Sequence, residues 1–261
     1  YNRICLGGGD FMKIKTIIVT MWFNRYNDIK NIYEVFGQKL NEYFPAFSMN
    51  NLPANFDPMI PRITAKSKSG HSTFNMSNIN IQLATQYDDN YNENFDSCIE
   101  YIKVRAKKIY DILSENSINI LYSAVLVNIN KDEENPIDSI QKNLLSSNID
   151  NSILSEVGMR VSMQIENKFY RIITVNNSKN YSMQKQINPG QFEIIMPLIS
   201  LRDAKMEKEY VAVNYELNDK YSFDTEENYN CNAETFDRMF KIVESDIKSN
   251  IEQFLNTGKI N

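Results

Sequence analysis

The residues able to act as a base or a nucleophile are few, because the chain has one histidine, His71, and three cysteines among its 261 residues. One histidine excludes zinc sites that need two imidazoles, and ribonuclease chemistry that uses a histidine pair. His71 could activate Ser72, Cys98 or Cys231, but such a base needs a third group to orient it, and no known motif marks one. The sequence therefore favours an exposed turn residue at position 71, and a hydrolase centred on it is the weakest hypothesis.

The cysteines and acidic residues also lack the spacing of known sites. Cys5, Cys98 and Cys231 form no C-x-x-C pair, which suits a reducing cytosol better than a disulfide framework. Cys98 lies on the apolar face of a predicted helix, where we expect a small, inert side chain. The segment from residue 88 resembles a calcium loop, but Glu93 and Ile99 stand where glycine and glutamate are needed. We expect neither a metal nor a cofactor.

The basic residues suggest a different chemistry, the binding of single-stranded RNA. One group alternates along a predicted strand, and the other lies on the outward side of a predicted helix. If the two groups converged, they could hold the RNA backbone while Tyr101 or Tyr110 stacked on its bases. The residues of this alternative site are Arg62, Lys66 and Lys68 on the strand, and Lys103, Arg105, Lys107 and Lys108 on the helix. Such groups are more often ordinary solvated faces, which is the interpretation we favour.

Composition and charge narrow the classes of protein. Hydrophobic residues make up 42% and charged residues 23%, which is enough to build a core and excludes a mostly disordered chain. No apolar run reaches the length of a bilayer span, so we expect no membrane partner. The net charge of -5 disfavours non-specific binding to DNA, and the excess of acidic residues lies in the second half of the chain. The 35 Asn and 32 Ile against 8 Gly indicate an A/T-rich bacterial or phage genome.

The first eleven residues have a pattern of their own. The stretch from Leu6 to Phe11 directly precedes Met12 and contains Gly-Gly-Asp, which is the in-frame translation of a ribosome-binding sequence. We therefore expect residues 1–11 to be a non-native leader. The alternative is a genuine glycine-rich turn, whereas a phosphate-binding loop cannot be completed there. No secretory signal pattern is present, so we expect a cytoplasmic protein.

Hydrophobic periodicity predicts a similar series of elements twice. In the first part we expect a strand over 13–24, a helix over 26–44, short antiparallel strands over 62–68, 72–76 and 79–87, and a helix ending at Asn116. In the second part we expect a strand over 118–130, a short helix over 136–145, a hairpin over 159–165 and 169–175, strands over 192–201 and 210–217, and a helix from Asn232 to Gly258.

Residues 12–116 and 117–261 are therefore two units of the same pattern. We predict an α+β fold with two topologically similar halves, in which one continuous antiparallel sheet has its helices packed on one face. Duplication and similarity of pattern alone both remain open, because the halves share no residue-level similarity.

Four stretches carry a resemblance to a known family: the opening strand and helix that end at Phe44-Pro45, the strand Ile118–Ile129, the strand Val211–Asp219, and the closing helix with Phe236 and Phe240. In this order, the chain resembles a sporadically distributed family of uncharacterised bacterial proteins of about the length from Met12 to Asn261. That family usually has a Gly-Leu-Arg-Tyr-like run in its central strand, where this chain has Ser123-Ala124-Val125-Leu126. The resemblance implies an architecture and no catalytic residues.

Because no catalytic constellation or cofactor loop is present, an enzyme is the less favoured class. We expect a non-catalytic cytoplasmic protein that binds a protein partner or associates with itself, in the conflict between phage and host that a sporadic distribution suggests. The alternative is a single-stranded RNA-binding or RNA-processing module with ferredoxin-like halves. Binding to RNA that is sensitive to salt would favour this alternative.

Overall fold

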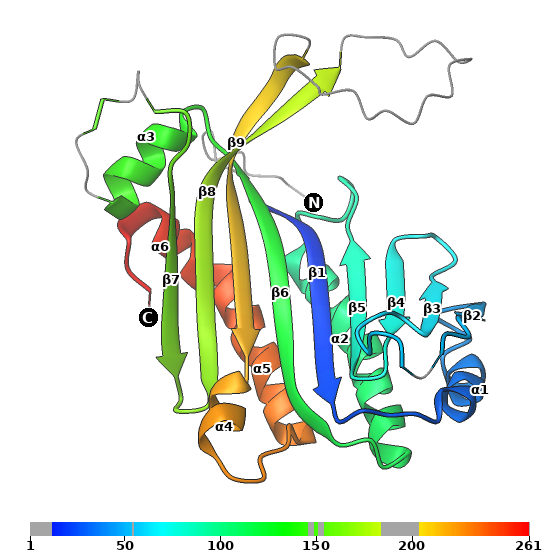
Figure 1. Ribbon diagram of the computed structural model, residues 1–261. Helices are drawn as coiled ribbons and strands as arrows, with labels where there is room; N and C mark the ends of the chain where they lie inside the picture. Colours follow the sequence, from blue (N-terminus) through cyan, green and yellow to red (C-terminus); the bar gives the residue numbers. More distant parts are fainter. Residues whose placement is uncertain (1–11, 54, 146–148, 151–153, 184–203, 261) are drawn as a thin grey trace, which may run out of the picture.

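A computed structural model describes residues 12–53, 55–145, 149–150, 154–183 and 204–260. These residues form one antiparallel sheet of nine strands, in the order β2-β3-β4-β5-β1-β6-β9-β8-β7, with the longer helices on one side of it (Figure 1). The α+β class and the single continuous antiparallel sheet that the sequence predicts are confirmed.

The first part of the chain supplies one side of the sheet and the longest helix. Its elements are β1 (Met12–Phe23), α1 (Ile29–Lys39), β2 (Phe47–Met49), β3 (Ile63–Lys66), β4 (Ser72–Met76), β5 (Asn80–Gln86) and α2 (Phe95–Glu115). Asn94 is the N-cap of α2, because its side chain accepts a hydrogen bond from the backbone amide of Ser97. Asn116 is the C-cap, at the predicted end of the helix.

The second part supplies the other side. Its elements are β6 (Ile120–Asp132), α3 (Pro136–Ile140), β7 (Gly158–Ile165), β8 (Phe169–Met183), β9 (Ala204–Asn218), α4 (Lys220–Thr225), α5 (Ala233–Ser245) and α6 (Ile251–Thr257). The predicted final helix has its N-cap at Asn232 and a left-handed C-cap at Gly258, but a π-helical turn over Asp246–Asn250 interrupts it. A second π turn, Gln141–Leu145, follows α3.

The two parts of the sheet join where β1 pairs with β6. On one side of this pair, β1 also pairs with β5, the last strand of the first part. On the other side, β6 pairs with β9, the last strand of the second part. The description of the chain as two similar halves is compatible with this pairing and stays a prediction.

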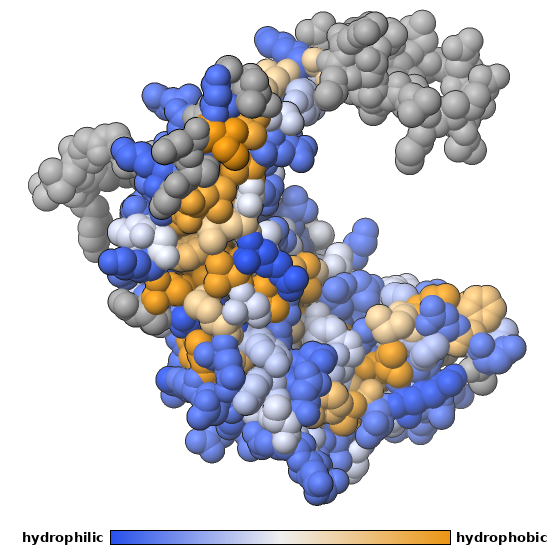
Figure 2. All heavy atoms as spheres, turned by 60° about the vertical axis from the view of Figure 1, so that its left-hand side comes forward, coloured by the Kyte–Doolittle hydropathy of each residue, from blue (hydrophilic) through white to orange (hydrophobic). Residues whose placement is uncertain are grey.

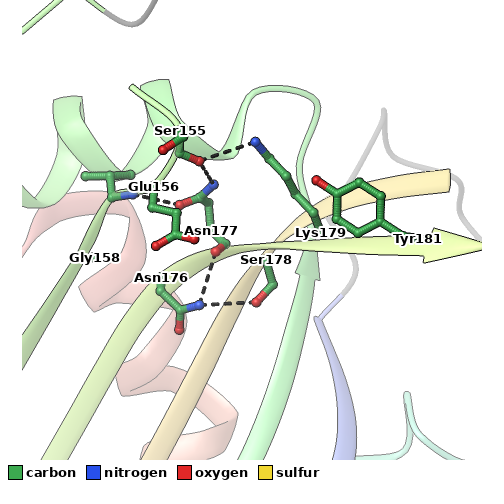
Figure 3. A pocket seen from close by; sticks show the side chains of 9 residues that line it. Ser155, Glu156, Gly158, Asn176, Asn177, Ser178, Lys179 and Tyr181 are labelled. Atoms are coloured by element: carbon green, nitrogen blue, oxygen red, sulfur yellow. Dashed lines mark hydrogen bonds between the residues drawn. The ribbon is translucent and has the colours of Figure 1, made fainter. Parts of the chain in front are cut away.

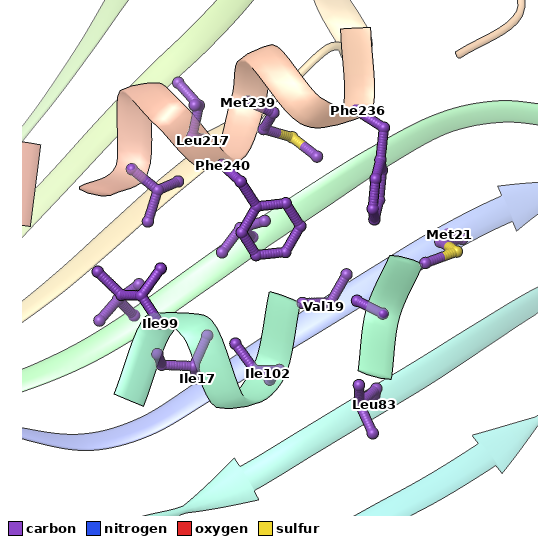
Figure 4. Close-up of a cluster of buried hydrophobic side chains, with 14 of the residues drawn as sticks. Ile17, Val19, Met21, Leu83, Ile99, Ile102, Leu217, Phe236, Met239 and Phe240 are labelled. Carbon is purple, nitrogen blue, oxygen red and sulfur yellow. The ribbon is translucent and has the colours of Figure 1, made fainter. Parts of the chain in front are cut away.

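The core lies between the sheet and the helices (Figure 4). The alternating side chains Ile17, Val19 and Met21 of β1 are almost fully buried. They face the layer formed by α2 and α5, in which the apolar stripe of α5 includes Phe236 and Phe240. Because every second residue of a strand points to the same face, burial of this set leaves the intervening residues of β1 on the opposite face.

Several elements differ from those predicted. The three-residue strand β2 lies where a loop was expected, and it forms by pairing with β3. The short helix α4 was not predicted, and β8 and β9 are longer than their apolar cores suggested. The strand expected over 192–201 and the leader at 1–11 lie outside the described residues.

Candidate functional site

The face of the sheet opposite the long helices is a candidate site. In β1, the side chains of Thr16, Ile18, Thr20 and Trp22 point to this face, because they alternate with the buried core residues. The centre of this face is formed by five neighbouring strands, in the order β5, β1, β6, β9 and β8. We call it the open face.

Strand register aligns the side chains of the open face in rows. The central row contains, strand by strand, Lys66, Thr73, Ala84, Ile18, Leu126, Glu216, Ile172 and Ser162. One neighbouring row contains Thr64, Asn75, Gln82, Thr20, Ala124, Asn218, Tyr170 and Gln164. The row on the other side contains Gln86, Thr16, Asn128, Asn214, Thr174 and Arg160.

These rows are almost free of charge. Lys66 lies toward one edge of the sheet and Arg160 on the strand at the other edge, so Glu216 is the one charged residue of the three rows between β5 and β8. The carboxylate of Glu216 accepts a hydrogen bond of 2.7 Å from the Asn218 amide group. A broad face of amide, hydroxyl and aliphatic groups resembles the centre of a protein–protein interface, where charged residues are depleted.

One end of the open face is aromatic. The rings of Trp22 and Tyr122 stack with their centroids 4.6 Å apart, and Phe223 of α4 lies 5.1 Å from Tyr122. Tyr221 of α4 contacts Tyr170 of β8 edge-on, at 5.4 Å. The short helix α4 therefore lies on the open side of the sheet and borders this face, unlike the long helices.

A buried polar network holds α4 in place. The carboxylate of Asp219, directly before α4, accepts hydrogen bonds of 2.6 Å from the backbone amide of Ser123 and from the hydroxyl of Tyr229. Burial raises the pKa of Asp219 above its usual range, and burial also raises the pKa of the Cys231 thiol beside it. A protonated, buried thiol is a poor nucleophile, so the chemistry of this cluster is structural.

His71 does not assemble a nucleophilic site. Its imidazole is exposed in the turn between β3 and β4, and its Nε2 lies 3.9 Å from Oδ2 of Asp88. The hydroxyl of Ser72 lies 2.9 Å from that of Thr85, inside the core. Burial raises the pKa of the Cys98 thiol to about 12, as expected for an inert side chain. Within the described chain, no hydrogen bond joins His71 to any of the three nucleophiles considered.

The strand group of the alternative RNA site is divided. Arg62 precedes β3 and is buried at 4% exposure, where its Nε donates a hydrogen bond of 2.9 Å to Oδ1 of Asn78. Lys66 is exposed on the open face, and Lys68 is exposed in the following turn. The expectation that these three cations form one surface is therefore corrected at Arg62, which serves as a structural donor.

The helix group lies on the other side of the sheet. Lys103 pairs with Glu100, and Lys107 pairs with Asp237 of α5 at 3.0 Å. The guanidinium of Arg105 lies between two tyrosine rings, 3.5 Å from the centroid of Tyr101 and 4.6 Å from that of Tyr43, and Lys108 is exposed. Because α2 covers the core face, these cations and Lys66 are on opposite sides of the sheet. The structure does not bring the two groups together.

A polar hollow of about 730 Å³ lies where β7 begins beside β8 (Figure 3). The side chain of Asn177 crosses it, accepting a hydrogen bond of 2.8 Å from the Val157 amide and donating one of 2.9 Å to Glu209. Lys179 donates to the carbonyl of Ser155 at 3.3 Å. These groups are engaged with one another, so the hollow ties the start of β7 to β8 and shows no reactive constellation.

The described residues contain no cluster of His, Cys, Asp and Glu able to hold a metal ion. In the same part of the chain, no helix is long and apolar enough to cross a membrane. The sequence matches no protein-family model and no curated protein.

Sequence reasoning identified the strands of the open face but not the face itself. The signal was present as alternation, for example in Gln82-Leu83-Ala84-Thr85-Gln86, where uncharged polar and small residues alternate with buried ones. The sequence did not indicate which strands lie next to each other, because each row is formed by strands that are far apart in the chain.

Proposed function

We propose that this protein is a non-catalytic binding protein and that the open face holds a protein partner. The observation that carries the proposal is the nearly uncharged surface that five adjacent strands present on the side away from the long helices. Two features support a protein ligand: aliphatic side chains at the centre, Ile18 and Leu126, and the aromatic end around Trp22.

The charge of the face favours protein over RNA. Sheets that bind single-stranded RNA combine stacking rings with cations that neutralise phosphates. Of the cations expected to do this, Lys66 lies on the open face, toward one edge of the sheet, and Lys68 lies in the turn that follows it. Arg62 is buried, and the helix group is on the opposite side of the sheet, while the centre of the open face carries the negative charge of Glu216. A phosphate backbone on this face would therefore meet a carboxylate and neutral groups.

Two lysines introduced on the open face would distinguish a protein partner from RNA. Gln82 and Asn214 are exposed on the open face, so Gln82→Lys/Asn214→Lys adds charge with little effect on the core. A neutral protein partner would lose affinity because two ammonium groups must be desolvated, whereas RNA would gain affinity through counterion release. The matched control, Gln38→Lys/Val104→Lys, adds the same charge at exposed positions of α1 and α2.

The experiment is affinity purification of the tagged full chain from its native host, with quantitative mass spectrometry and a nuclease-treated parallel. We expect a protein that is recovered by the natural chain and by the control, and whose recovery falls about tenfold or more with the face variant, which corresponds to about 1.4 kcal/mol. Equal recovery by the face variant would refute the proposal. Nuclease-sensitive RNA that increases with the face variant would instead support the RNA-binding alternative.

A further inference from the structure

The two edges of the sheet differ in how they are protected. One edge is β2, a strand of three residues that lies between Pro45 and Pro53. Short edge strands and nearby prolines limit pairing with a further strand. The other edge is β7, which has eight residues, contains no proline, and has one charged residue, Arg160. Among the described strands, β7 offers the longer free edge.

The backbone groups on the outer side of β7 can be assigned from its pairing with β8. The backbone N–H of Asn177 donates to the backbone carbonyl of Val157 at 3.1 Å, so Val157 and Asn177 form a hydrogen-bonded pair of the ladder. In an antiparallel ladder such pairs alternate, and therefore Met159, Val161 and Met163 direct their backbone groups to β8. The N–H and C=O groups of the residues between them, Arg160, Ser162 and Gln164, point outward from the sheet.

Apolar side chains accompany this free edge. Met159, Val161, Met163 and Ile165 point to the helix side and are only partly buried, although they pack against the core. Figure 2 brings the β7 side of the molecule forward and shows hydrophobic side chains gathered in a band with hydrophilic residues on both sides. A free ladder beside a partly exposed apolar band is the surface to which a further strand adds.

We propose that β7 pairs antiparallel with β7 of a second copy of this chain, about a two-fold axis that runs perpendicular to the sheet between the Ser162 residues of the two copies. The occupant follows from self-complementarity. A two-fold axis in this direction keeps the helices of both copies on the same side of the joined sheet. Two residues that lie directly opposite each other across the contact must therefore have their side chains on the same side of that sheet. Two residues can then face each other only if their numbers add to an even sum, because side chains alternate along the strand.

The registers centred on Val161 and on Ser162 each pair seven of the eight residues of β7, but only the register centred on Ser162 pairs all four apolar side chains of the helix side. It places Met159 opposite Ile165 and Val161 opposite Met163, so that apolar side chains meet on the helix side. It also places Arg160 opposite Gln164, so that no like charges meet. The outward backbone groups of Arg160, Ser162 and Gln164 then form hydrogen-bonded pairs across the axis. The backbone hydrogen bonds, the apolar side chains and the position of Arg160 are thus all compatible with this register.

The dimer does not depend on the proposed function of the open face. Because both copies keep the same side toward the viewer of Figure 1, their open faces would lie next to each other on one side of an eighteen-stranded sheet, twice the nine strands of a single copy. Ser162 lies at the edge of the open face, away from Gln82 and Asn214. Loss of the dimer and loss of the partner are therefore separate results.

The test uses charge at the axis. In the proposed register, residue 162 of one copy faces residue 162 of the other, so Ser162→Lys and Ser162→Glu each place two like charges together. Sedimentation equilibrium of the natural full chain should show a dimer, and each variant should raise the dimer dissociation constant about tenfold or more, with unchanged circular dichroism. An equimolar mixture of the two variants should recover the dimer. The matched control is Ser48→Lys, at an exposed position of the other edge strand, and it should remain dimeric.

Hydrogen exchange gives a second measurement that needs no variant. The amides of Arg160, Ser162 and Gln164 should exchange quickly in dilute monomer and slowly in the dimer, whereas those of Val161 and Met163 should be protected in both. A natural chain that stays monomeric at about 100 µM, well above a micromolar dissociation constant, would overturn the proposal. A dimer that tolerates both Ser162 variants, or that leaves these three amides unprotected, would overturn it as well.

Discussion

The buried ion pair between Arg171 of β8 and Asp246 ties the free-edge side of the sheet to the helix layer. The Nε atom of Arg171 lies 2.8 Å from Oδ2 of Asp246, and its Nη2 donates to Oδ1 at 3.0 Å. The hydroxyl of Tyr215 and the amide of Asn250 donate to the same carboxylate, at 2.6 and 2.7 Å. Asp246 is 1% exposed and Arg171 is 7% exposed, so solvent cannot replace a lost partner.

We expect Asp246→Leu to lower the free energy of unfolding by about 3–5 kcal/mol, because it leaves a guanidinium buried without its carboxylate. Arg171→Met should cost about 3 kcal/mol, at the lower end of the range, because Tyr215 and Asn250 still donate to the carboxylate. The double variant removes both charges of this pair and should cost only about 1–3 kcal/mol, the penalty for an unpaired tyrosine hydroxyl. The two substitutions should therefore be strongly non-additive.

The assay is urea unfolding at neutral pH, followed by circular dichroism. With a denaturant dependence of about 3 kcal/mol per molar urea, Asp246→Leu should move the midpoint down by about 1 M or more. The control is the exposed pair Lys220–Asp224, joined at 2.8 Å, whose disruption by Asp224→Leu should cost less than about 1 kcal/mol. A cost below about 1 kcal/mol for Asp246→Leu, or additive single effects, would refute the reasoning.

Three further predictions concern other buried or packed groups. In a Cys5→Ser background, maleimide should label Cys98 and Cys231 only after unfolding, because burial raises both thiol pKa values; rapid labelling of the native protein would contradict this. Because burial raises the pKa of Asp219, its native carboxyl retains a proton that the unfolded chain releases, and stability falls as pH rises above the ordinary value of 3.8. Urea unfolding at several pH values should therefore show that the free energy of unfolding of Asp219→Asn rises relative to that of the natural chain as pH rises. Parallel plots of the free energy of unfolding against pH for the two proteins would exclude the effect. Arg105→Ala should cost about 1–2 kcal/mol in the same assay, more than Lys108→Ala, because Arg105 packs between two rings; equal costs would disprove that packing.

Elements with strong local signals could be predicted from the sequence. Helix α2 has an asparagine cap at each end and an apolar stripe between them, and β6 is a long run of branched and apolar residues. Such signals lie within one segment, because a helix or strand depends first on its own periodicity and caps. The strand β2 was missed for the opposite reason, since its three residues form a strand only through their pairing with β3.

The candidate site was less predictable than the fold. Arg62 and Lys66 look alike in the sequence, yet one is buried beside Asn78 and the other is exposed on the open face. Four positions separate them, but Arg62 precedes β3, and the carbonyl of Pro53 and the side chain of Asn78 supply it with acceptors inside the fold. Which cation reaches solvent therefore depended on segments distant in the chain.

The sequence by itself determined the class of the protein: an α+β chain with a substantial core, one histidine, and no spacing of residues that supports a metal or a nucleophile. Only the tertiary structure decided which strands are neighbours, and so it decided that neutral residues of five strands share one face and that β7 lies at an edge. The physical reason is that burial and alternation act within a segment, whereas register and strand order arise from pairing between segments that the sequence separates.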